Sequence, residues 1–471
     1  MKELINVLDQ IDGILYYPIL MVILIAFGLY FSFRTRFVQL RLFPESIRVL
    51  KEKPSDGKIS SFQALMVSTA SRVGTGNIIG VSTAVCLGGP GAVFWMQLLA
   101  IIGGASAFIE STLAQIYKRG RSEKESYGGP GYYIEYALHQ KWLGVLFVVF
   151  LILTYGFGFN MLCSYNLQST FAGYSFYDEK HTPIVIGIII AALVFICIMG
   201  GGKRMVRTTE VLVPIMGVLY VAVAFIVIIA NITKIGDVIV MIFKDAFNFR
   251  AMISGGFGGS CMIYGIKRGL YSNEAGVGSA PNAAATATVS HPVKQGLVQM
   301  LSVYIDTLLL CTATALMCLF SGVARNPDDA GAPYVQNAVE SVIGKFGPSF
   351  ITAAMILFAF TTLIGNLYYV DNGLTYLNGK KMPGKKFMVG WRILCAVVIV
   401  LGAVIPMNAA WDLADIFMGG MAIINLPSCL ALSNTAIKCT KDYERQKKEG
   451  KNPVFHAKEH GIDLDTIEFW K

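Results

Sequence analysis

Long apolar stretches alternate with short polar connections along this chain, and the alternation predicts a bundle of membrane-spanning helices. About 20 predominantly apolar residues cross the hydrocarbon core of a bilayer as one α-helix. The stretches that we interpret as spans are 15–33, 62–87, 92–117, 143–166, 183–199, 211–231, 252–266, 296–320, 350–369, 388–405 and 413–436. We therefore expect an all-α integral membrane protein with eleven transmembrane helices.

The second apolar stretch is interrupted at its middle. Gly74 and Gly76 stand there, with Arg72 and Asn77 on either side. Non-helical backbone at membrane depth persists only where it is buried in protein or lines a polar cavity. Freed carbonyl groups can coordinate a dehydrated cation, and a helix that restarts near Asn77 offers N–H groups to a carboxylate. The interruption therefore predicts a binding site.

The expected spans divide into two halves of five, residues 62–231 and residues 252–436. Halves with an odd number of spans insert with opposite orientation, which is the inverted-repeat plan of many secondary transporters. The seventh stretch contains Gly-Gly-Phe-Gly-Gly-Ser at 255–260. We expect a second discontinuous helix there. Close packing of small residues between helices is the alternative explanation for glycines in a span.

Three segments lie outside the two halves. Residues 1–61 are expected to form an accessory span and a basic loop, residues 232–251 an amphipathic connector, and residues 437–471 a charged tail. Apolar residues recur at helical spacing in the connector and again in 335–346. These two amphipathic segments either cover one end of the bundle or close over a cavity as a lid.

Composition supports the membrane interpretation. Of 471 residues, 54% are hydrophobic and 15% are charged, whereas about a quarter of the residues in soluble domains are charged. The net charge of +9 does not indicate nucleic-acid binding, because Lys and Arg are concentrated in alternate loops. The basic segments that we assign to the inner side are 34–58, 118–141, 203–207, 267–268, 294, 380–386 and the tail. This asymmetry predicts a multi-pass protein of the cell membrane with the N-terminus outside and the C-terminus in the cytoplasm.

Ionisable side chains inside spans are rare and usually face the bundle interior. Arg72 stands one turn before the first interruption, where pairing with carbonyl groups or with Glu110 would form a gate toward the cytoplasm. A purely structural ion pair is the alternative. Asp306 is the best carboxylate candidate for a cation ligand. The hydroxyls of Thr361 and Thr362 can ligate as well, or they can bond back to the preceding helical turn.

Sodium prefers hard oxygen ligands, roughly five or six of them. The candidate oxygen donors are the side chains of Asn77, Asp306, Thr361 and Thr362 and the carbonyls of Ala70 and Val73. The nine cysteines lie almost wholly in apolar stretches without metal-ligand spacing, so we interpret them as packing residues. No separate cofactor is expected.

Three motifs make the chain similar to a known family. Gly74-Thr-Gly-Asn-Ile78, Gly88-Gly-Pro-Gly-Ala-Val-Phe-Trp-Met96 and the run Arg268-Gly-Leu-Tyr-Ser-Asn-Glu-Ala-Gly-Val-Gly-Ser-Ala-Pro-Asn-Ala-Ala-Ala-Thr286 resemble the sodium:alanine/glycine symporters of bacteria and archaea. The similarity extends from about residue 62 to residue 436. It implies the leucine-transporter fold, with a five-plus-five inverted repeat and two discontinuous helices.

The resemblance also implies roles for individual residues. Thr75 and Gly76 would present backbone N–H groups to the substrate carboxylate, and Gly256, Phe257 and Gly258 would line the other side of the pocket. The implied sodium ligands are Asn77 and Asp306 at a site that touches the substrate, and Ala70, Val73, Phe358, Thr361 and Thr362 at a second site.

Two positions depart from the family pattern. Gln97 stands where Trp is usual, and Cys163 occupies a position in the fourth span where a Gln is expected after the Asn-Met pair. Because that span faces the cavity, we place Cys163 among the substrate-binding residues. This departure from the family pattern leaves open which amino acid the protein binds.

The expected function is sodium-coupled symport of a small neutral amino acid by a monomer. Glycines at 255–259 favour alanine or glycine, and glutamine or another polar amino acid is the alternative. A channel would need a continuous polar pore and usually subunit symmetry. An enzyme would need a nucleophile with a base, or metal ligands. The tail pattern His456-Ala-Lys-Glu459-His460 has the spacing of inverted zinc proteases, but no catalytic domain surrounds it.

Overall fold

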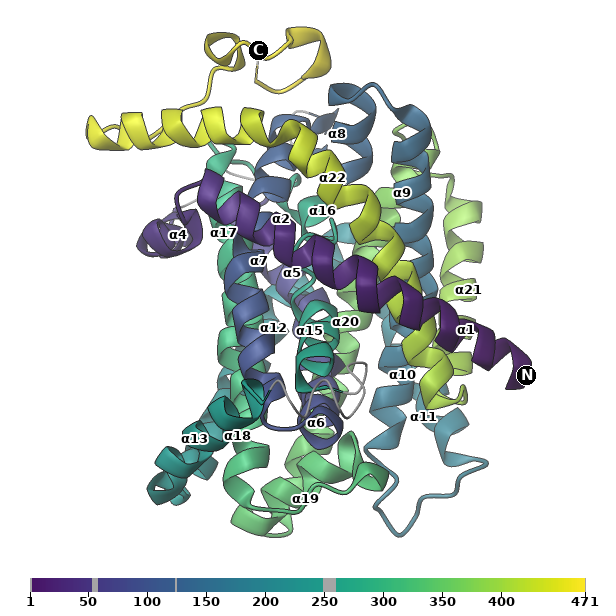
Figure 1. Ribbon diagram of the computed structural model, residues 1–471. Coiled ribbons are helices and arrows are strands. Elements are labelled where there is room, and N and C mark those ends of the chain that lie inside the picture. Colours follow the sequence, from purple (N-terminus) through teal and green to yellow (C-terminus); the bar gives the residue numbers. More distant parts are fainter. Residues whose placement is uncertain (1, 53–57, 123–124, 249–259, 471) are drawn as a thin grey trace.

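The computed structural model is a bundle of long helices that run between two ends (Figure 1). It describes residues 2–52, 58–122, 125–248 and 260–470. The C-terminal segment covers one end of the bundle, which we call the tail end. Helices α13 (Ile235–Ala246) and α19 (Ala332–Ile343) lie at the opposite end, which we call the far end. Both amphipathic segments expected from the sequence are thus helices at the same end.

Six helices in the described part of the chain are long and apolar enough to cross a membrane. They are α7 (Gly91–Ile116), the continuous run of α9 (Lys141–Leu153), η4 (Thr154–Gly158) and α10 (Phe159–Ser169), α12 (Gly201–Ala230), the run of α17 (Val293–Val303), η7 (Tyr304–Cys311) and α18 (Thr312–Ser321), α20 (Phe346–Leu377), and α22 (Met407–Lys448). Shorter apolar helices are α2 (Met21–Arg34), the run Gly76–Gly88 and α11 (Thr182–Ile198). Helix α21 (Lys385–Gly402) packs against α11.

The helices differ in how much of their apolar surface the protein covers. The protein buries 72% of the most apolar stretch of α7 and of α20, but only 28% of the corresponding stretch of α12. Ile215, Val218 and Leu219 of α12 are exposed. An outward apolar face of this size is typical of contact with lipid. Helices α7 and α20 therefore form the centre of the bundle, and α12 forms part of its perimeter.

The N-terminal segment runs obliquely across the bundle and crosses α22 (Figure 1). It consists of α1 (Lys2–Ile14), a π-helical turn η1 (Leu15–Leu20), α2, α3 (Val38–Arg41) and α4 (Phe43–Leu50). Helix α22 contains Pro427, bends toward the tail end, and continues across it. A proline inside a helix removes one backbone hydrogen bond and kinks the axis.

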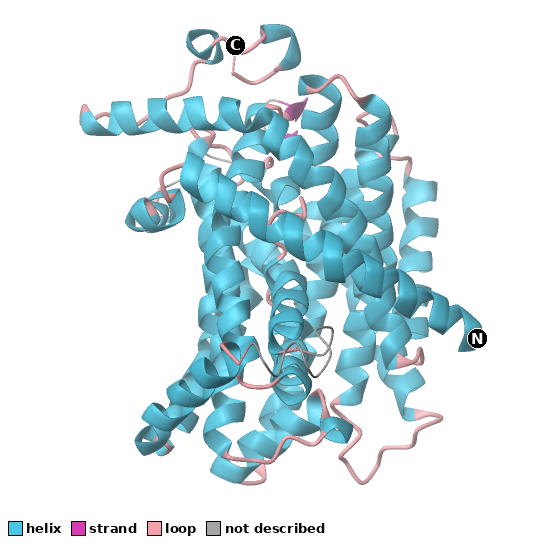
Figure 2. Cartoon of the chain, viewed as in Figure 1, coloured by secondary structure: helices cyan, strands magenta, loops and turns pink. Residues whose placement is uncertain are grey.

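The chain between α7 and α9 also lies at the tail end. Strands β1 (Arg119–Ser122) and β2 (Glu125–Tyr127) pair antiparallel, with Arg119 opposite Tyr127, and helix α8 (Pro130–Ala137) follows. Figure 2 shows this strand pair among helices and loops, close to the C-terminal segment.

The second expected span is interrupted where the glycines predict it. Helix α5 (Ser61–Arg72) starts at Ser60, whose hydroxyl accepts the Gln63 N–H while the Gln63 side chain accepts the Ser60 N–H. Such a capping box stabilises a helix start by about 1 kcal/mol. The helix ends at Arg72 and resumes at Gly76 as η2 (Gly76–Gly80), α6 (Val81–Thr83) and η3 (Ala84–Gly88).

A second interruption follows the seventh expected span. Helix α15 (Cys261–Asn273) is followed by non-helical residues 274–279 and by the short α16 (Ala280–Ala284). Gly276 and Gly278 have φ angles of 83° and 93°, a region that glycine enters without steric cost. The expected interruption at 255–260 lies outside the described residues except for Ser260, whose hydroxyl caps α15. The interruption that the structure describes, at 274–279, was not predicted from the sequence.

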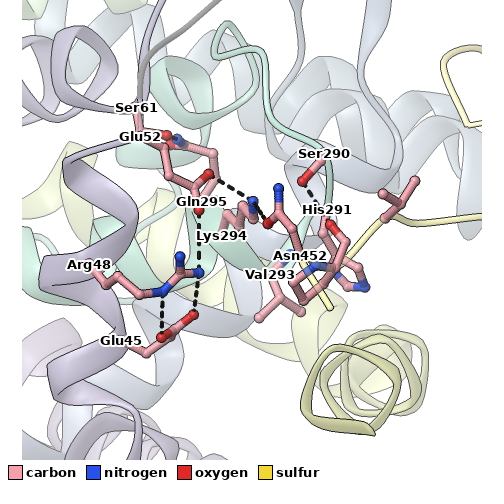
Figure 3. A network of polar contacts seen from close by, with 12 residues as sticks. Glu45, Arg48, Glu52, Ser61, Ser290, His291, Val293, Lys294, Gln295 and Asn452 are labelled. Atoms are coloured by element: carbon pink, nitrogen blue, oxygen red, sulfur yellow. Dashed lines mark hydrogen bonds and ion pairs between the residues drawn. The ribbon is translucent and has the colours of Figure 1, made fainter. Parts of the chain in front are cut away.

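The tail end is held together by a polar network (Figure 3). The Lys294 ammonium donates to Glu52 Oε2 at 2.7 Å and to Asn452 Oδ1 at 2.8 Å. Arg48 of α4 pairs with Glu45 at 2.7 Å and with Glu52 at 3.3 Å. The network therefore joins α4, the start of α17 and the residues after α22.

The last residues fold back onto the bundle rather than extending as a free tail. The Phe455 N–H donates to the Ser290 carbonyl at 3.0 Å, and the Trp470 indole donates to the Gln115 carbonyl at 2.8 Å. Phe455 is 3% exposed. The segment expected as a charged tail is thus part of the packed structure at this end.

Candidate functional site

The two interruptions lie side by side and share a buried polar region with α20. The hydroxyl of Ser71, in the last turn of α5, donates to Asn366 Oδ1 of α20 at 2.7 Å and lies 3.5 Å from Glu274 Oε1. Glu274 is the first residue after α15. All three side chains are fully or almost fully buried. The ends of two discontinuous helices thus meet at one place inside the bundle.

The expected substrate-binding residues of the first interruption are in close contact with α10 and α15. A Cβ atom added to Gly76 would stand 2.5 Å from Cε1 of Tyr271, so only glycine permits this approach. The hydroxyl of Thr75 accepts the Asn166 amide at 3.1 Å. The Cys163 thiol lies 3.6 Å from the Ala359 carbonyl. The remaining expected residues, Gly256, Phe257 and Gly258, lie outside the described residues.

Asn77 and Asp306 are brought together. The Asn77 amide donates to Asp306 Oδ1 at 2.7 Å, while Asn77 Oδ1 accepts the Gly74 N–H at 2.8 Å. Asp306 Oδ2 accepts the hydroxyls of Ser272 at 2.7 Å and Thr307 at 2.9 Å. The sequence did not single out these two hydroxyls, because Ser and Thr in a helix commonly bond back to their own backbone.

The second expected oxygen set forms between α5 and α20. The Thr362 hydroxyl lies 3.1 Å from the Ala70 carbonyl and 3.5 Å from the Val73 carbonyl, the groups freed where α5 ends. Thr361 bonds back to its own helix, at 3.0 Å from the Leu357 carbonyl and 3.2 Å from that of Phe358. A set of carbonyl and hydroxyl oxygens is the chemistry that hard cations prefer.

Gly74 allows this approach of α20. A Cβ atom at Gly74 would overlap the Thr362 hydroxyl, and one at Gly365 of α20 would stand 2.6 Å from the Ser71 nitrogen. The glycines therefore serve close packing as well as the interruption itself.

The expected pairing of Arg72 with Glu110 is not formed. Arg72 is 2% exposed, and its guanidinium donates to the Gln299 carbonyl at 3.3 Å. Within the described chain it has no carboxylate within 4.0 Å. The carbonyl alternative is therefore the observed one.

Glu110 is bound instead to an asparagine on α22. The Asn425 amide donates to Glu110 Oε2 at 2.8 Å and to the Gly276 carbonyl at 2.9 Å. Its oxygen accepts the Tyr133 hydroxyl of α8. Asn425 thus connects α22, α7, α8 and the second interruption on the tail-end side of the site. Asn425 is one of three asparagines in the 42-residue α22, and nothing in the local sequence marks it for this role.

Aromatic rings form a cover beside the first interruption, where Tyr271 packs against Gly76. The Tyr271 ring lies between those of Phe159, at 4.6 Å, and Trp411, at 4.8 Å. The Arg268 guanidinium stacks 3.5 Å above the Trp411 ring and lies 3.6 Å from Asp415 Oδ2. Cation–π stacking and ion pairing together hold this cover in place.

Lys267 and Arg268 correct the charge assignment made from the sequence. Both were counted in an inner loop, but they lie within α15. Lys267 pairs with Asp12 of α1 at 2.5 Å and with Asp415 of α22 at 3.7 Å. Paired basic groups are tolerated inside a bundle, so hydropathy alone placed the end of this span too early.

Several buried polar atoms near the interruptions have no hydrogen-bond partner within the described part of the chain. They are the hydroxyls of Tyr155, Tyr369 and Ser164, Nδ2 of Asn160 and Oδ1 of Asn166. Buried polar groups are normally paired, with protein or with bound molecules. These five atoms belong to α10, α20 and η4. Among the described residues, no three His, Cys, Asp or Glu side chains form a metal-binding group.

Comparison with known proteins agrees with this geometry. The family model described as "Sodium:alanine symporter family" matches residues 1–457. The chain is 44% identical to the probable sodium/glutamine symporter GlnT of Bacillus subtilis, over 99% of this chain and 96% of that protein. It is 43% identical to the amino-acid carrier protein AlsT of the same organism, over 100% and 99%. It is 34% identical to the sodium/alanine symporter AgcS of Methanococcus maripaludis, over 96% and 100%.

A solved structure shows the fold. The crystal structure of MhsT in complex with L-phenylalanine superposes with a TM-score of 0.56 at 16% identity, covering 83% of this chain and 99% of that one. This is the leucine-transporter type of fold that the motifs implied. The chain, a multi-pass membrane protein, belongs to the sodium:alanine symporter family.

Proposed function

We propose that this protein is a secondary active transporter that carries a small neutral amino acid into the cell together with sodium, by alternating access. The observation that carries the proposal is the meeting of two interrupted helices, where the Thr362 hydroxyl reaches the freed carbonyls of Ala70 and Val73. Such an arrangement binds a cation and a zwitterion in one place. It requires no nucleophile and no resident cofactor.

The sodium ions would occupy the two oxygen sets. One set contains Asn77 and Asp306, which are already in contact. The other contains the carbonyls of Ala70, Val73 and Phe358 and the hydroxyls of Thr361 and Thr362. Sodium would replace the hydrogen bonds that now hold these oxygens. Each net positive charge moved inward gains about 2.3 kcal/mol per 100 mV of membrane potential, which corresponds to roughly 50-fold accumulation.

The amino acid would bind with its carboxylate at the start of η2. Thr75 and Gly76 supply N–H groups at the positive end of a helix dipole. Tyr271 packs directly against this position, with the Phe159 ring behind it, and the two rings limit the size of the side chain. Alanine or glycine is therefore the proposed substrate.

Glutamine is the second candidate. Nδ2 of Asn160 and the Ser164 hydroxyl, one turn apart on α10, are buried without hydrogen-bond partners among the described residues, and they can donate to and accept from a side-chain carboxamide. The relative GlnT is named a probable glutamine symporter.

We propose the following architecture in the membrane. Eleven helices cross the bilayer, and residues 62–231 and 252–436 form two inverted repeats. The tail end faces the cytoplasm, so that the N-terminus lies outside the cell membrane and the C-terminus inside. The transporting unit is a monomer, because both interruptions belong to one chain.

Uptake by the purified protein in proteoliposomes tests the proposal. Vesicles loaded with one unlabelled amino acid at a time are diluted into labelled alanine, glycine or glutamine, with sodium or with choline. We expect counterflow of a small neutral amino acid only with sodium. Counterflow of the same size in choline, or with none of the three amino acids, would refute the proposed function.

A further inference from the structure

Glu274 is a buried carboxyl group at the junction of the two interruptions. It follows the last residue of α15 with a φ of 51°, and its side chain is 0% exposed. Oε2 accepts the Ser279 hydroxyl at 2.5 Å, and Oε1 lies 3.5 Å from the Ser71 hydroxyl. Ser279 ends the second interruption and Ser71 precedes the first, so this carboxyl connects both.

The carboxyl has no cationic partner in direct contact. In the described part of the chain, no Lys, Arg or His nitrogen lies within 4.0 Å of Glu274, and Arg72 acts on it only from a greater distance. Two other buried carboxylates of the bundle have cationic partners, whereas Glu110 and Asp306 are held by amide and hydroxyl donors. Asp371 contacts Arg392 at 3.1 Å, and Asp415 contacts both Lys267 and Arg268. An ionised carboxylate that is buried without a partner is costly.

Unpaired oxygens surround the same group. Within the described part of the chain, the buried hydroxyl of Tyr155 has no hydrogen-bond partner, and Glu274 and Ser279 are the polar groups that face it. The buried hydroxyl of Tyr369 likewise has none among the described residues, and it faces Ser71. One carboxylate with several hydroxyls that can rotate their lone pairs inward is a ligand set for a small cation.

We propose that Glu274, with the hydroxyls of Ser71 and Ser279, binds a cationic group between the two interruptions. The inference rests on the proposed function, which supplies two such groups, a sodium ion and the α-ammonium group of the amino acid. Tyr271 packs against Gly76, next to Thr75, and stands three residues before Glu274 at the end of α15. An amino acid bound with its carboxylate at Thr75 would therefore lie beside the helix end that carries Glu274.

Substitution of Glu274 tests the site on the full-length protein. Glu274→Gln removes the charge and keeps the size, and Glu274→Asp keeps the charge. Glu210→Gln is the matched control, since Glu210 of α12 contacts Gln63 at 3.1 Å, away from the interruptions. Ligand binding is measured by the increase in the melting temperature of each protein. In one titration sodium is added without amino acid, and in the other alanine or glutamine is added at saturating sodium.

The two sources of the cation give different results. If the site binds sodium, Glu274→Gln weakens the sodium titration at least about tenfold without amino acid present. If it binds the ammonium group, the sodium titration is unchanged and the amino-acid titration weakens at least about tenfold. Lactate, which has a hydroxyl in place of the ammonium group, then binds both proteins equally. In either case Glu274→Asp retains part of the affinity, and Glu210→Gln behaves as wild type.

The proposal is overturned if both titrations of Glu274→Gln match wild type within twofold. If this variant does not fold, Ser279→Ala and Ser71→Ala, which keep the charge, decide the question, and unchanged titrations in both refute the site. Failure of the proposed function is distinguishable, because wild type would then show no sodium-dependent uptake. If the wild-type protein transports and the Glu274 variants bind sodium and amino acid as the wild type does, only the inference about Glu274 is refuted.

Discussion

At the scale of single residues, the site depends on how closely side chains approach the two interruptions. Gly74 and Gly76 leave room for a hydroxyl and an aromatic ring, where any Cβ would collide. The Gly74 N–H donates to the side-chain oxygen of Asn77 in place of a helical backbone carbonyl. These residues therefore shape the non-helical backbone in addition to any contact with a ligand.

Gly76→Val is expected to lower sodium-dependent uptake by at least about 100-fold, because the new side chain must displace the Tyr271 ring and overpacking of this kind typically costs 1–3 kcal/mol. Uptake of labelled amino acid in proteoliposomes measures it. Gly217→Val in α12 is the matched control, since nothing lies within 4 Å of that position. Thr75→Val keeps the backbone N–H groups and should retain most uptake. Normal uptake by Gly76→Val would count against the site.

Asn77→Ala is expected to raise the sodium concentration for half-maximal uptake about tenfold or more. The change removes the amide that joins Gly74 to Asp306, and one hydrogen bond to a charged group contributes about 1.5–3 kcal/mol. The measurement is uptake against sodium concentration at constant ionic strength. Asn231→Ala, at the end of α12, should leave the sodium dependence unchanged. An unaltered curve for Asn77→Ala would remove Asn77 from the ligand set.

At the scale of elements, Asn425 connects four parts of the chain at the tail-end side of the site. Its contacts to Glu110, Gly276 and Tyr133 hold α22 against α7, α8 and the second interruption. It stands two residues before Pro427, where α22 lacks a backbone hydrogen bond. In the orientation proposed above, movement of α22 away from these partners would open the site toward the cytoplasm.

Cys429 reports on this movement, because its thiol is 1% exposed and lies 3.5 Å from the Tyr133 hydroxyl. Asn425→Ala removes four hydrogen bonds, one of them donated by the Cys429 thiol itself at 3.7 Å, each of about 1 kcal/mol, and is expected to speed maleimide modification of Cys429 at least about tenfold. Mass spectrometry of the labelled peptide measures the rate. Asn434→Ala on the same helix, whose side chain accepts a hydrogen bond from Arg34, is the control. Equal rates in the two variants would exclude the assigned role of Asn425.

At the scale of the whole molecule, the C-terminal residues close the tail end over the start of α17 and the loop before it. His291 of that loop is fully buried, and burial lowers its pKa from 6.5 to about 4. Asp442, His460 and Lys294 face the same ring. The ring is therefore neutral in the packed state at physiological pH.

The packing of residues 449–470 is expected to weaken as the pH falls below about 6.5. Because the buried ring binds no proton until about pH 4, the unpacked state gains protons first, and stability falls by up to about 1.4 kcal/mol per pH unit in that window. Hydrogen exchange of this segment, corrected for intrinsic rates, measures it at pH 7.5, 6.0 and 5.0. His291→Phe should abolish the pH dependence. Protection that stays constant in wild type would contradict the expectation.

The amino-acid sequence by itself determined that the chain is a helical membrane bundle, where its first interruption lies and which family it resembles. These features are local, because apolar runs and glycine pairs show in any stretch of chain. It also grouped Asn77 with Asp306, and Thr362 with Ala70, as oxygen donors of shared sites, and the structure brings both pairs into contact.

Only the tertiary structure decided that residues 274–279 interrupt the seventh span and that Lys267 and Arg268 lie inside it. It also placed Glu110 with Asn425 rather than Arg72, and Glu274 beside Ser71. Each of these depends on partners that are distant in sequence, such as Asp12 and Asp415 for the two basic residues. A buried charge is tolerated only through such partners, so its place follows from the packed fold and not from local pattern.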